Sequence, residues 1–454
     1  GIVLPILSLV ILPLVVSFMQ EVKWYHLAFI YNILLPIGVY LLTRQILSRR
    51  PSGYGGKSIE EIAPFLKQSK KKKVKLFGAT RYLSAGTIAI LIFIPFFLIG
   101  ISPLIIHTIS PEFDIRFMGV EETPEKVIGG LSFLGYQREC IEGYEGTICT
   151  YKGPFGIGAT ILGIALIAGI GIALSVYYNI LSREALKVRE KVKRLEQEFA
   201  GALFQLANRL GDGLPIEIAI KKVAETMKGT PTGRFFNAAY NNITKLGYDI
   251  ERAIFDEHVG AIKVFPSPLV EASMKVLVDS IKKGPIIASR ALINISTYVR
   301  DINRLEERLK DLMADELSSM KTQVGFLAPV ISGIVIGITS MITTILVNLQ
   351  ERMGMLQQLG EGMQQFQSFS SLLGMFRLGI PTYYFQIIVG LYLLEVVYLL
   401  VGLINGIENG EDILAKRGML SKYMTSTTML YSVIAIIVIL IFNFLAATIT
   451  TTGI

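Results

Sequence analysis

Long apolar stretches constrain this chain more than any other feature. Seven of them are long enough to cross a bilayer as helices, which takes about 20 apolar residues. They cover residues 1–19, 26–47, 83–109, 155–181, 324–347, 381–405 and 427–449. The chain is 52% hydrophobic and 18% charged, which agrees with a membrane protein. We therefore predict an all-α, polytopic membrane protein with about seven transmembrane helices and an inserted helical bundle.

Lysine and arginine assign the two sides of the membrane. Eleven basic and two acidic residues lie between Arg44 and Arg81, which gives this short segment a net charge of +9. Short basic loops stay in the cytoplasm, so we place this segment inside. The segment 110–153 then falls outside, and its eight acidic against four basic residues agree. The seven spans put the N-terminus inside and the C-terminus outside the plasma membrane.

These assignments divide the chain into five parts. The first two are an N-terminal transmembrane hairpin (1–47) and a basic cytoplasmic loop with a short helix (48–82). A transmembrane pair (83–181) follows, with an external loop at 110–153, and then a cytoplasmic helical bundle (182–323). The last part consists of three C-terminal transmembrane helices (324–454), with an external interfacial segment at 348–380. The bundle is the largest part that is not apolar, so we expect it to carry the function.

Both ends of the bundle are predicted to be long helices that leave the membrane. On each of them apolar residues recur at alternating steps of four and three. They are Val188, Val192, Leu195, Phe199, Ala202 and Leu206 on the first, and Ile295, Tyr298, Ile302, Leu305, Leu309 and Leu312 on the second. This spacing places one narrow apolar stripe on each helix, as in a coiled coil. The stripes are either plain bundle core or the seam of two paired helices that form a stiff stalk.

Glycine and proline divide the bundle into about six helices. The first long helix is expected to end at Gly211-Asp212-Gly213, and Pro215 to open a second helix that ends before Gly233. Further helices are expected at 234–246, at 248–258, after Pro268 and after Pro285. The bundle shows no convincing alternating strand pattern, so we predict that it is entirely helical.

The stretch LANRLGDGLPIEIAIKKVAETMKGTPTGRFF, Leu206 to Phe236, is similar to the signature region of the type II secretion system F family. More narrowly, it resembles archaeal platform proteins of type IV pili and of the archaellum. The resemblance extends to the arrangement of a helical domain between membrane spans, over about residues 155–450. The segment 48–81 is too short for the second bundle of the bacterial members, which favours either the archaeal branch or a truncated start.

The resemblance implies a scaffold in the inner membrane. It would couple a hexameric secretion ATPase to the insertion of pilin-like subunits into a filament. The candidate ATPase contacts are the turns and basic residues of the similar stretch: Gly211, Asp212, Gly213, Pro215, Lys221, Lys222, Thr230, Gly233 and Arg234. The glycines among them can equally serve only as helix stops.

Glu395 lies near the middle of the predicted span 381–405. An ionisable group at that depth is costly and is therefore a functional candidate. It is either a polar contact for the membrane helix of a pilin or a packing residue bonded to Asn32, Asn443 or a tyrosine. The alternative function is a membrane permease subunit of an ATPase-driven transporter, which needs a polar path through several spans.

Small residues four apart let two membrane helices approach closely. Gly333 and Gly337 have this spacing. They serve either packing within one chain or contact in a homodimer.

A basic patch in the 48–82 loop consists of Lys70, Lys71, Lys72, Lys73 and Lys75. Such a run binds either anionic membrane lipids or an acidic partner. No aromatic residues alternate with these lysines, so we expect no nucleic-acid partner.

The predicted external loop holds both cysteines, Cys140 and Cys149. In an oxidising exterior they are expected to form a disulfide. A metal site is not expected there, because no histidine lies near the pair. The three histidines of the chain are scattered, and no nucleotide-binding loop, zinc-protease helix or nucleophile elbow is present. We therefore expect neither an enzyme nor a cofactor.

Overall fold

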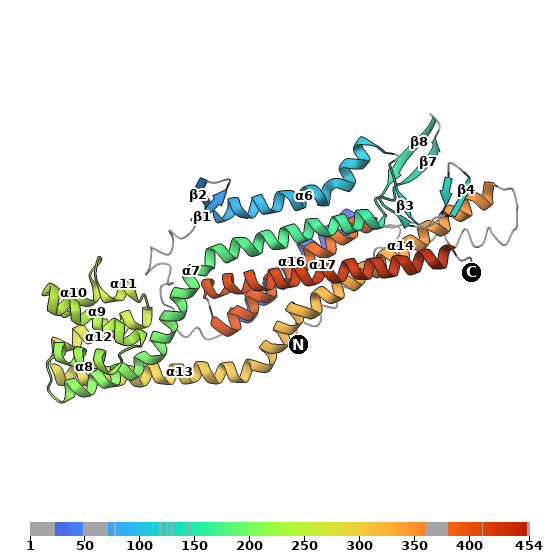
Figure 1. Cartoon of the computed structure of the whole chain (residues 1–454). Coiled ribbons are helices and arrows are strands. Elements are labelled where there is room, and N and C mark those ends of the chain that lie inside the picture. Colours follow the sequence, from blue (N-terminus) through green and yellow to red (C-terminus); the bar gives the residue numbers. More distant parts are fainter. Residues whose placement is uncertain are drawn as a thin grey trace.

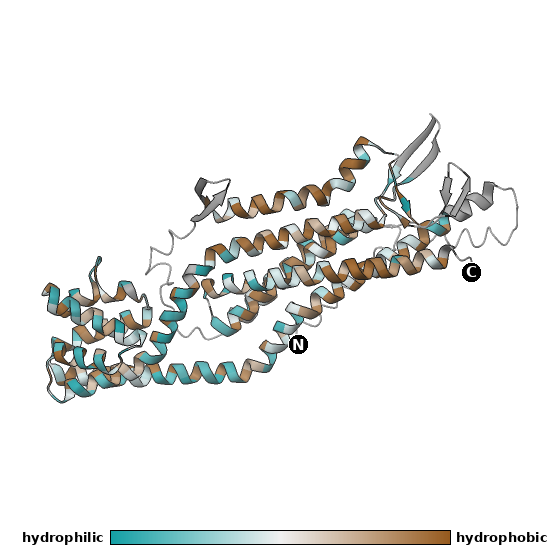
Figure 2. Ribbon diagram, in the orientation of Figure 1, coloured by the Kyte–Doolittle hydropathy of each residue, from teal (hydrophilic) through white to brown (hydrophobic). Residues whose placement is uncertain are grey.

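The computed structural model describes residues 23–48, 71–76, 79–111, 113–117, 120–123, 126–128, 131–143, 146–358, 380–410 and 412–451. This part of the chain is mainly helical. Long helices lie side by side, with a group of shorter helices at one end and short strands near the other (Figure 1). The long helices are apolar over much of their length, whereas the group of shorter helices carries many hydrophilic residues (Figure 2).

Six of the seven predicted spans are confirmed as helices long and apolar enough to cross a membrane. Within the described residues these stretches are Trp24–Gln45, Ala85–Ile109, Ile157–Arg183, the apolar part of Pro285–Gln350, Thr382–Asn409 and Ile413–Ile449. The seventh predicted span, 1–19, lies outside the described residues. So does most of the predicted interfacial segment 348–380, although the helix of the preceding span continues to Gln358.

The membrane helices pack around α16 (Thr382–Asn409), whose side chains are buried along most of its length. Three long helices surround it: α7 (Ile157–Gly211), α14 (Ala328–Gln358) and α17 (Ile413–Thr451). The N-terminal span also lies along α16 and consists of α3 (Trp24–Phe29), η1 (Ile30–Leu34) and α4 (Leu35–Ser48). By contrast, α6 (Ala85–Ile109) packs mainly on α7.

Two π-helical turns interrupt the long helices. η1 directly precedes the turn that contains Pro36, which has no backbone N–H to donate. η3 (Gln323–Leu327) joins α13 (Pro285–Thr322) to α14. There the Thr427 hydroxyl donates to the Val324 carbonyl at 3.2 Å and so satisfies a buried backbone group beside the irregular turn.

Between α7 and α13 the chain forms five shorter helices. They are α8 (Ile216–Thr226), α9 (Pro231–Leu246), α10 (Ile250–Phe255), α11 (Ala261–Val264) and α12 (Pro268–Ile281). The predicted stop at Gly211, the predicted end of a helix at 246 and the predicted starts after Pro215, Pro268 and Pro285 are confirmed to within a few residues; only α11 was missed. Gly247 ends α9 with φ of +67°, a conformation that favours glycine.

The first predicted apolar stripe is confirmed. From Val192 to Leu206 its residues are buried, and from Leu195 on they belong to the core of the bundle. Val188, nearer the membrane, is only partly buried.

Of the second predicted stripe only Ile295 packs against the bundle core, and the prediction is wrong for the rest. Tyr298, Leu305 and Leu312 are 56%, 56% and 80% exposed. The buried face of α13 instead contains Ser289, Leu292, Ser296 and Val299. Ser289 and Ser296 donate to the carbonyls of Ala207 and Ala200, each at 2.7 Å. These small polar residues let α13 approach α7 closely, which turns the larger apolar residues away. The two helices pack at their far ends and separate toward the membrane (Figure 1).

Four antiparallel two-stranded sheets complete the described part of the chain, and the sequence analysis did not predict them. They pair β1 (Lys71–Leu76) with β2 (Ala79–Ser84), β3 (Arg116–Phe117) with β6 (Leu131–Ser132), β4 (Val120–Thr123) with β5 (Lys126–Ile128), and β7 (Gln137–Gly143) with β8 (Gly146–Lys152). The first includes four lysines of the basic patch, and Lys70 lies outside the described residues.

Candidate functional site

The two long helices that join the bundle to the membrane helices are α7 and α13, here called the connecting helices. Each forms an ion pair near the place where α16 ends and α17 begins: one with Asp412, just before α17, and the other with Glu408, in the last turn of α16. Arg189 of α7 donates from Nε to Oδ2 of Asp412 at 2.7 Å. Lys321 of α13 lies 2.8 Å from Oε2 of Glu408. Both connecting helices are therefore tied to the same few residues of the membrane part.

Asp412 is held in place by the helix that it begins. Its Oδ1 accepts the backbone N–H groups of Leu414 (3.0 Å) and Ala415 (3.1 Å), which have no partner inside α17. The Asp412 carbonyl accepts the Asn405 side-chain amide of α16 at 3.0 Å. A negative charge also stabilises a helix N-terminus. One aspartate thus joins α7, α16 and α17.

Glu196 extends this contact into the bundle. It lies two helical turns beyond Arg189 on α7, and its Oε2 accepts from Nη1 of Arg189 at 3.2 Å. Its other oxygen accepts the Ser267 hydroxyl at 2.6 Å. Ser267 is the N-cap of α12. We call Ser267, Glu196, Arg189 and Asp412 the junction network.

The junction network is largely shielded from solvent. The side chains of Arg189, Glu196 and Asp412 are 25%, 21% and 14% exposed. Burial alone would lower the pKa of Arg189. The carboxylates of Glu196 and Asp412 more than offset this and hold that pKa above its ordinary value. The arginine is therefore charged at any physiological pH and joins two carboxylates from different parts of the fold.

The second ion pair borders an open cavity of about 610 Å³ between α13, η3 and the end of α16. Its lining includes Lys310, Ser318, Lys321, Thr322, Phe326 and Glu408. The cavity forms because α13 leaves the membrane helices at an angle. On the α7 side the contact with Asp412 is largely buried, whereas on the α13 side the Lys321–Glu408 pair lies at the edge of this open cavity.

The predicted ATPase contacts fall into two separate groups. Gly211, Asp212 and Gly213 end α7 at the far end of the bundle and are exposed, as is Pro215. Thr230 and Gly233 lie at the other end of α8, where Thr232 donates to the Leu195 carbonyl at 3.3 Å.

The two groups do not form one surface. Along α7, Leu195 and Gly211 are separated by about 24 Å at 1.5 Å per residue. The exposed Lys221 and Lys222 lie on α8 between the two groups, and Arg234 is exposed at the start of α9.

Thr230 and Gly233 have clear structural roles. The Thr230 hydroxyl caps α9 by accepting the Gly233 N–H at 3.0 Å. A Cβ at Gly233 would collide with the Met227 carbonyl. The exposed members of the predicted set are therefore the better candidates for contact with a partner.

Glu395 lies on α16 beside the N-terminal span. Its Oε2, the Tyr31 hydroxyl and Oδ1 of Asn32 are buried without a hydrogen-bond partner among the described residues. The Tyr31 and Tyr392 rings meet edge to face, with centroids 5.6 Å apart. Asn443, one expected partner of Glu395, instead bonds Thr344 and Ser340.

Gly333 and Gly337 pack against α17 of the same chain. A Cβ at Gly333 would lie 2.8 Å from the Ile434 side chain, and one at Gly337 would collide with Val438. The structure thus places α17 of the same chain against both glycines, and the homodimer contact stays a prediction.

Cys140 and Cys149 are direct partners in the register of β7 and β8. Opposed residues of an antiparallel pair have Cα atoms roughly 4.5–5.5 Å apart, within the range that a disulfide spans. Their predicted pairing stays a prediction.

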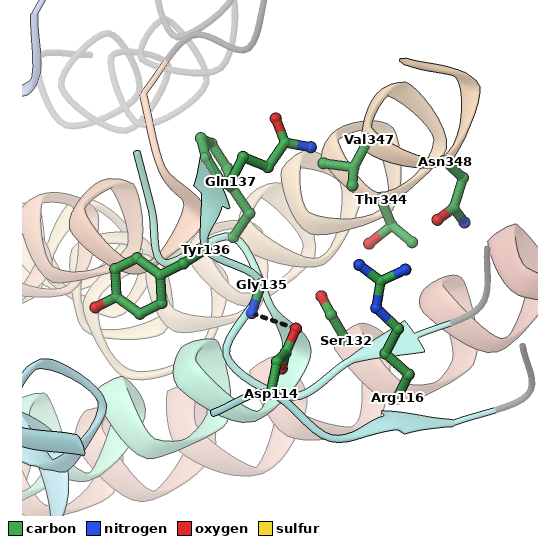
Figure 3. A pocket seen from close by; sticks show the side chains of 10 residues that line it. Asp114, Arg116, Ser132, Gly135, Tyr136, Gln137, Thr344, Val347 and Asn348 are labelled. Carbon is green, nitrogen blue, oxygen red and sulfur yellow. Dashed lines mark hydrogen bonds between the residues drawn. The ribbon is translucent and has the colours of Figure 1, made fainter. Parts of the chain in front are cut away.

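A small pocket lies near the strands (Figure 3). Its lining includes Asp114, Arg116, Ser132, Thr344 and Asn348. The Asp114 carboxylate accepts the backbone N–H groups of Leu134 (2.8 Å) and Gly135 (3.3 Å). The cavity measures about 20 Å³, which is enough for about one water molecule. It is a small gap between packed elements and is too small for a substrate.

The sequence analysis did not identify the junction network. An aspartate just before an apolar helix is a recognisable N-cap signal for Asp412. The pairing of Arg189 with Asp412 spans 223 residues and has no local signal.

Within the described residues, no group of three His, Cys, Asp or Glu side chains is placed to bind a metal ion. Comparison of the chain with protein-family models, with curated proteins and with solved structures found no match.

Proposed function

We propose that this protein is the inner-membrane platform of an archaeal type IV filament machine, a pilus or an archaellum. In this role it couples a cytoplasmic secretion ATPase to the insertion of pilin-like subunits. The likeness of Leu206–Phe236 to the type II secretion system F family supports the proposal. The observation that carries it is that both connecting helices form ion pairs where α16 ends and α17 begins, α7 with Asp412 before α17 and α13 with Glu408 in the last turn of α16.

These contacts give the bundle a mechanical path to the membrane helices. α7 is a single helix of 55 residues with its first half among the membrane helices and its last turns in the bundle core. Work done on the bundle would tilt this helix. Arg189 and Lys321 would pass the motion to α16 and α17, where a pilin-like subunit would be lifted. The protein itself needs no catalytic group for this task.

The proposal requires the bundle to face the cytoplasm. Glu257 is exposed in the turn after α10. A cysteine at this position should react with a membrane-impermeant maleimide only after intact cells are opened. Reaction in intact cells would place the bundle outside and end the proposal.

The ATPase is expected to bind the exposed turn at 211–215 together with the exposed lysines of α8. Charge reversal at Lys221 and Lys222 of the full-length protein should reduce co-purification of the secretion ATPase from membranes. Arg234→Glu is the matched comparison, because Arg234 is exposed but lies at the start of α9, on the other group of predicted contacts. Equal retention of the ATPase by the wild type and the Lys221/Lys222 variant would remove this assignment.

Unpartnered polar atoms on α16 and on the N-terminal span that packs along it favour a second candidate function, a permease subunit driven by a separate ATPase. Glu395, Tyr31 and Asn32 each leave an oxygen atom buried without a hydrogen-bond partner in the described part of the chain. A permease would use such groups to pass a polar solute. Glu395→Gln should then abolish solute uptake and leave filament assembly intact, whereas loss of filaments alone supports the platform.

A further inference from the structure

An apolar stripe on α13 belongs to neither large hydrophobic core of the described residues. It consists of Ile302, Leu305, Leu309 and Leu312, and is called here the α13 stripe. Leu305, Leu309 and Leu312 are 56%, 47% and 80% exposed. An adjoining face of the same helix, with Leu317, packs toward the membrane core. Exposure of three leucines in eleven residues of one helix is costly unless another surface covers them.

The residue types in the α13 stripe are those of a two-stranded coiled coil. Its spacing of three, four and three places Ile302 and Leu309 at a positions and Leu305 and Leu312 at d positions. Leucine fills both d positions, and Ile302 is β-branched at the first a position, a combination that favours two parallel helices; Leu309 at the second a position does not add to this preference. We propose that the α13 stripe of one copy pairs with the same stripe of a second copy.

The membrane supplies both the direction and the register of this pairing. α13 continues through η3 into α14, which is a candidate membrane span. In every copy α13 therefore leaves the membrane in the same direction, with the stripe at the same height. Identical residues meet at each layer, as a two-fold symmetric interface requires. A soluble partner would have to provide orientation and register by other means.

The stripe is short, with about two heptads, and would pair weakly between free helices. Confinement of both copies to one membrane raises their effective concentration, so a short seam suffices. This interface differs from the predicted contact at Gly333 and Gly337, which α17 covers.

The charges beside the stripe oppose the pairing and so provide a test. Asp301 is a g residue and Glu306 is the e residue five positions later, and both are exposed. In a parallel pair these two positions face each other across the seam. Asp301 of one copy then lies near Glu306 of the other, a like-charge contact that salt screens. Burial of the apolar stripe supplies the attraction.

The first experiment is disulfide cross-linking of the full-length protein in native membranes. Leu305→Cys and Leu312→Cys place thiols at d positions, where parallel helices are closest. Glu307→Cys is the matched control, because it is exposed on the far face of the same turn. We expect dimers from both d-position variants and only the wild-type background from Glu307→Cys. Equal cross-linking at all three positions, or none at the d positions, would overturn the proposal.

The second experiment changes the flanking charges and leaves the seam intact. In a Leu312→Cys background, Asp301→Lys or Glu306→Lys alone turns two repulsive pairs into two attractive ones and should raise dimer yield about fivefold. The double variant restores like charges and should return the yield to the starting value. Additive gains in the double variant would contradict the proposed pairing. These assays need no ATPase or filament, so their outcome is independent of the proposed function.

Discussion

Arg189 and Asp412 are 223 residues apart in the sequence, and their side chains meet at 2.7 Å between Nε and Oδ2. Lys321 and Glu408 repeat this relationship on the other connecting helix at 2.8 Å. The two connecting helices thus reach the end of α16 and the start of α17. Asp412 and Glu408 lie where α16 ends and α17 begins. At this place each carboxylate has a cationic partner, Arg189 or Lys321, which the membrane interior would not offer.

Replacement of Arg189 by Met should lower the free energy of unfolding by about 1–3 kcal/mol, because two largely buried carboxylates lose their partner. Detergent-solubilised protein unfolded by denaturant gives the measurement. A double-mutant cycle with Asp412→Asn should show coupling between the two positions. Lys275→Ala is the control: its pair with Glu271 is exposed at the lysine and should contribute less than about 0.5 kcal/mol. Additive effects of Arg189→Met and Asp412→Asn would contradict the direct contact.

Gly337→Ala should destabilise the membrane part by about 1–3 kcal/mol, because the new methyl group meets Val438 of α17. Gly38→Ala on α4 is the matched control, since a Cβ there meets nothing within 4 Å. Thermal unfolding of the two variants in the same detergent makes the comparison. If both melt like the wild type, the close packing of α14 on α17 is wrong.

Gly233→Ala and Gly201→Ala should shift stability in opposite directions. At Gly233 the added Cβ collides with the Met227 carbonyl and should disrupt the turn from α8 to α9. Gly201 lies inside α7 with open space around it, so alanine there should add about 0.5–1 kcal/mol through better helix propensity. Melting temperatures of the full-length variants test this. A stabilising Gly233→Ala would refute the structural role given to this glycine.

The Asp256 carboxylate should contribute a pH-dependent part of the bundle's stability. Its Oδ1 accepts the backbone N–H groups of His258 and Val259, which lower its pKa below the ordinary value of 3.8. Because the folded pKa is depressed, this stabilisation is complete above pH 3.8 and is lost as pH falls through the folded pKa. Asp256→Asn keeps an acceptor but removes the charge. Its melting temperature should lie below that of the wild type at pH 7, and the gap should close in acid. A constant gap across pH would show that the charge is not responsible.

The membrane helices were predictable from sequence because their signal is local and repeated. Uninterrupted apolar runs located six spans, and Gly211, Pro215, Pro268 and Pro285 marked the ends of bundle helices through their backbone preferences. The prediction that the second apolar stripe would be buried was wrong for a physical reason. Spacing alone does not reveal that Ser289 and Ser296 permit a closer approach than Ile295 and Tyr298, so the rotation of α13 depends on contacts with α7.

The candidate site was less predictable than the fold. Glu395 was singled out because its depth in a span can be read from the sequence. The junction network depends on contacts between residues that are far apart in the chain, and each of its charges looks like an ordinary surface residue in isolation. The short strands were also missed, because pairs of two to seven residues give too few alternations to stand out from a loop.

The two connecting helices enter the membrane differently. α7 runs unbroken from Ile157 to Gly211, whereas the other passes through η3, with Gly325 at its middle and the hydroxyl of Thr427 on its backbone. In the proposed function, α7 would act as a lever and η3 as the point about which α13 turns. A force on the bundle would not push it straight toward the bilayer but would swing it in an arc, with α7 setting the radius and η3 allowing the turn.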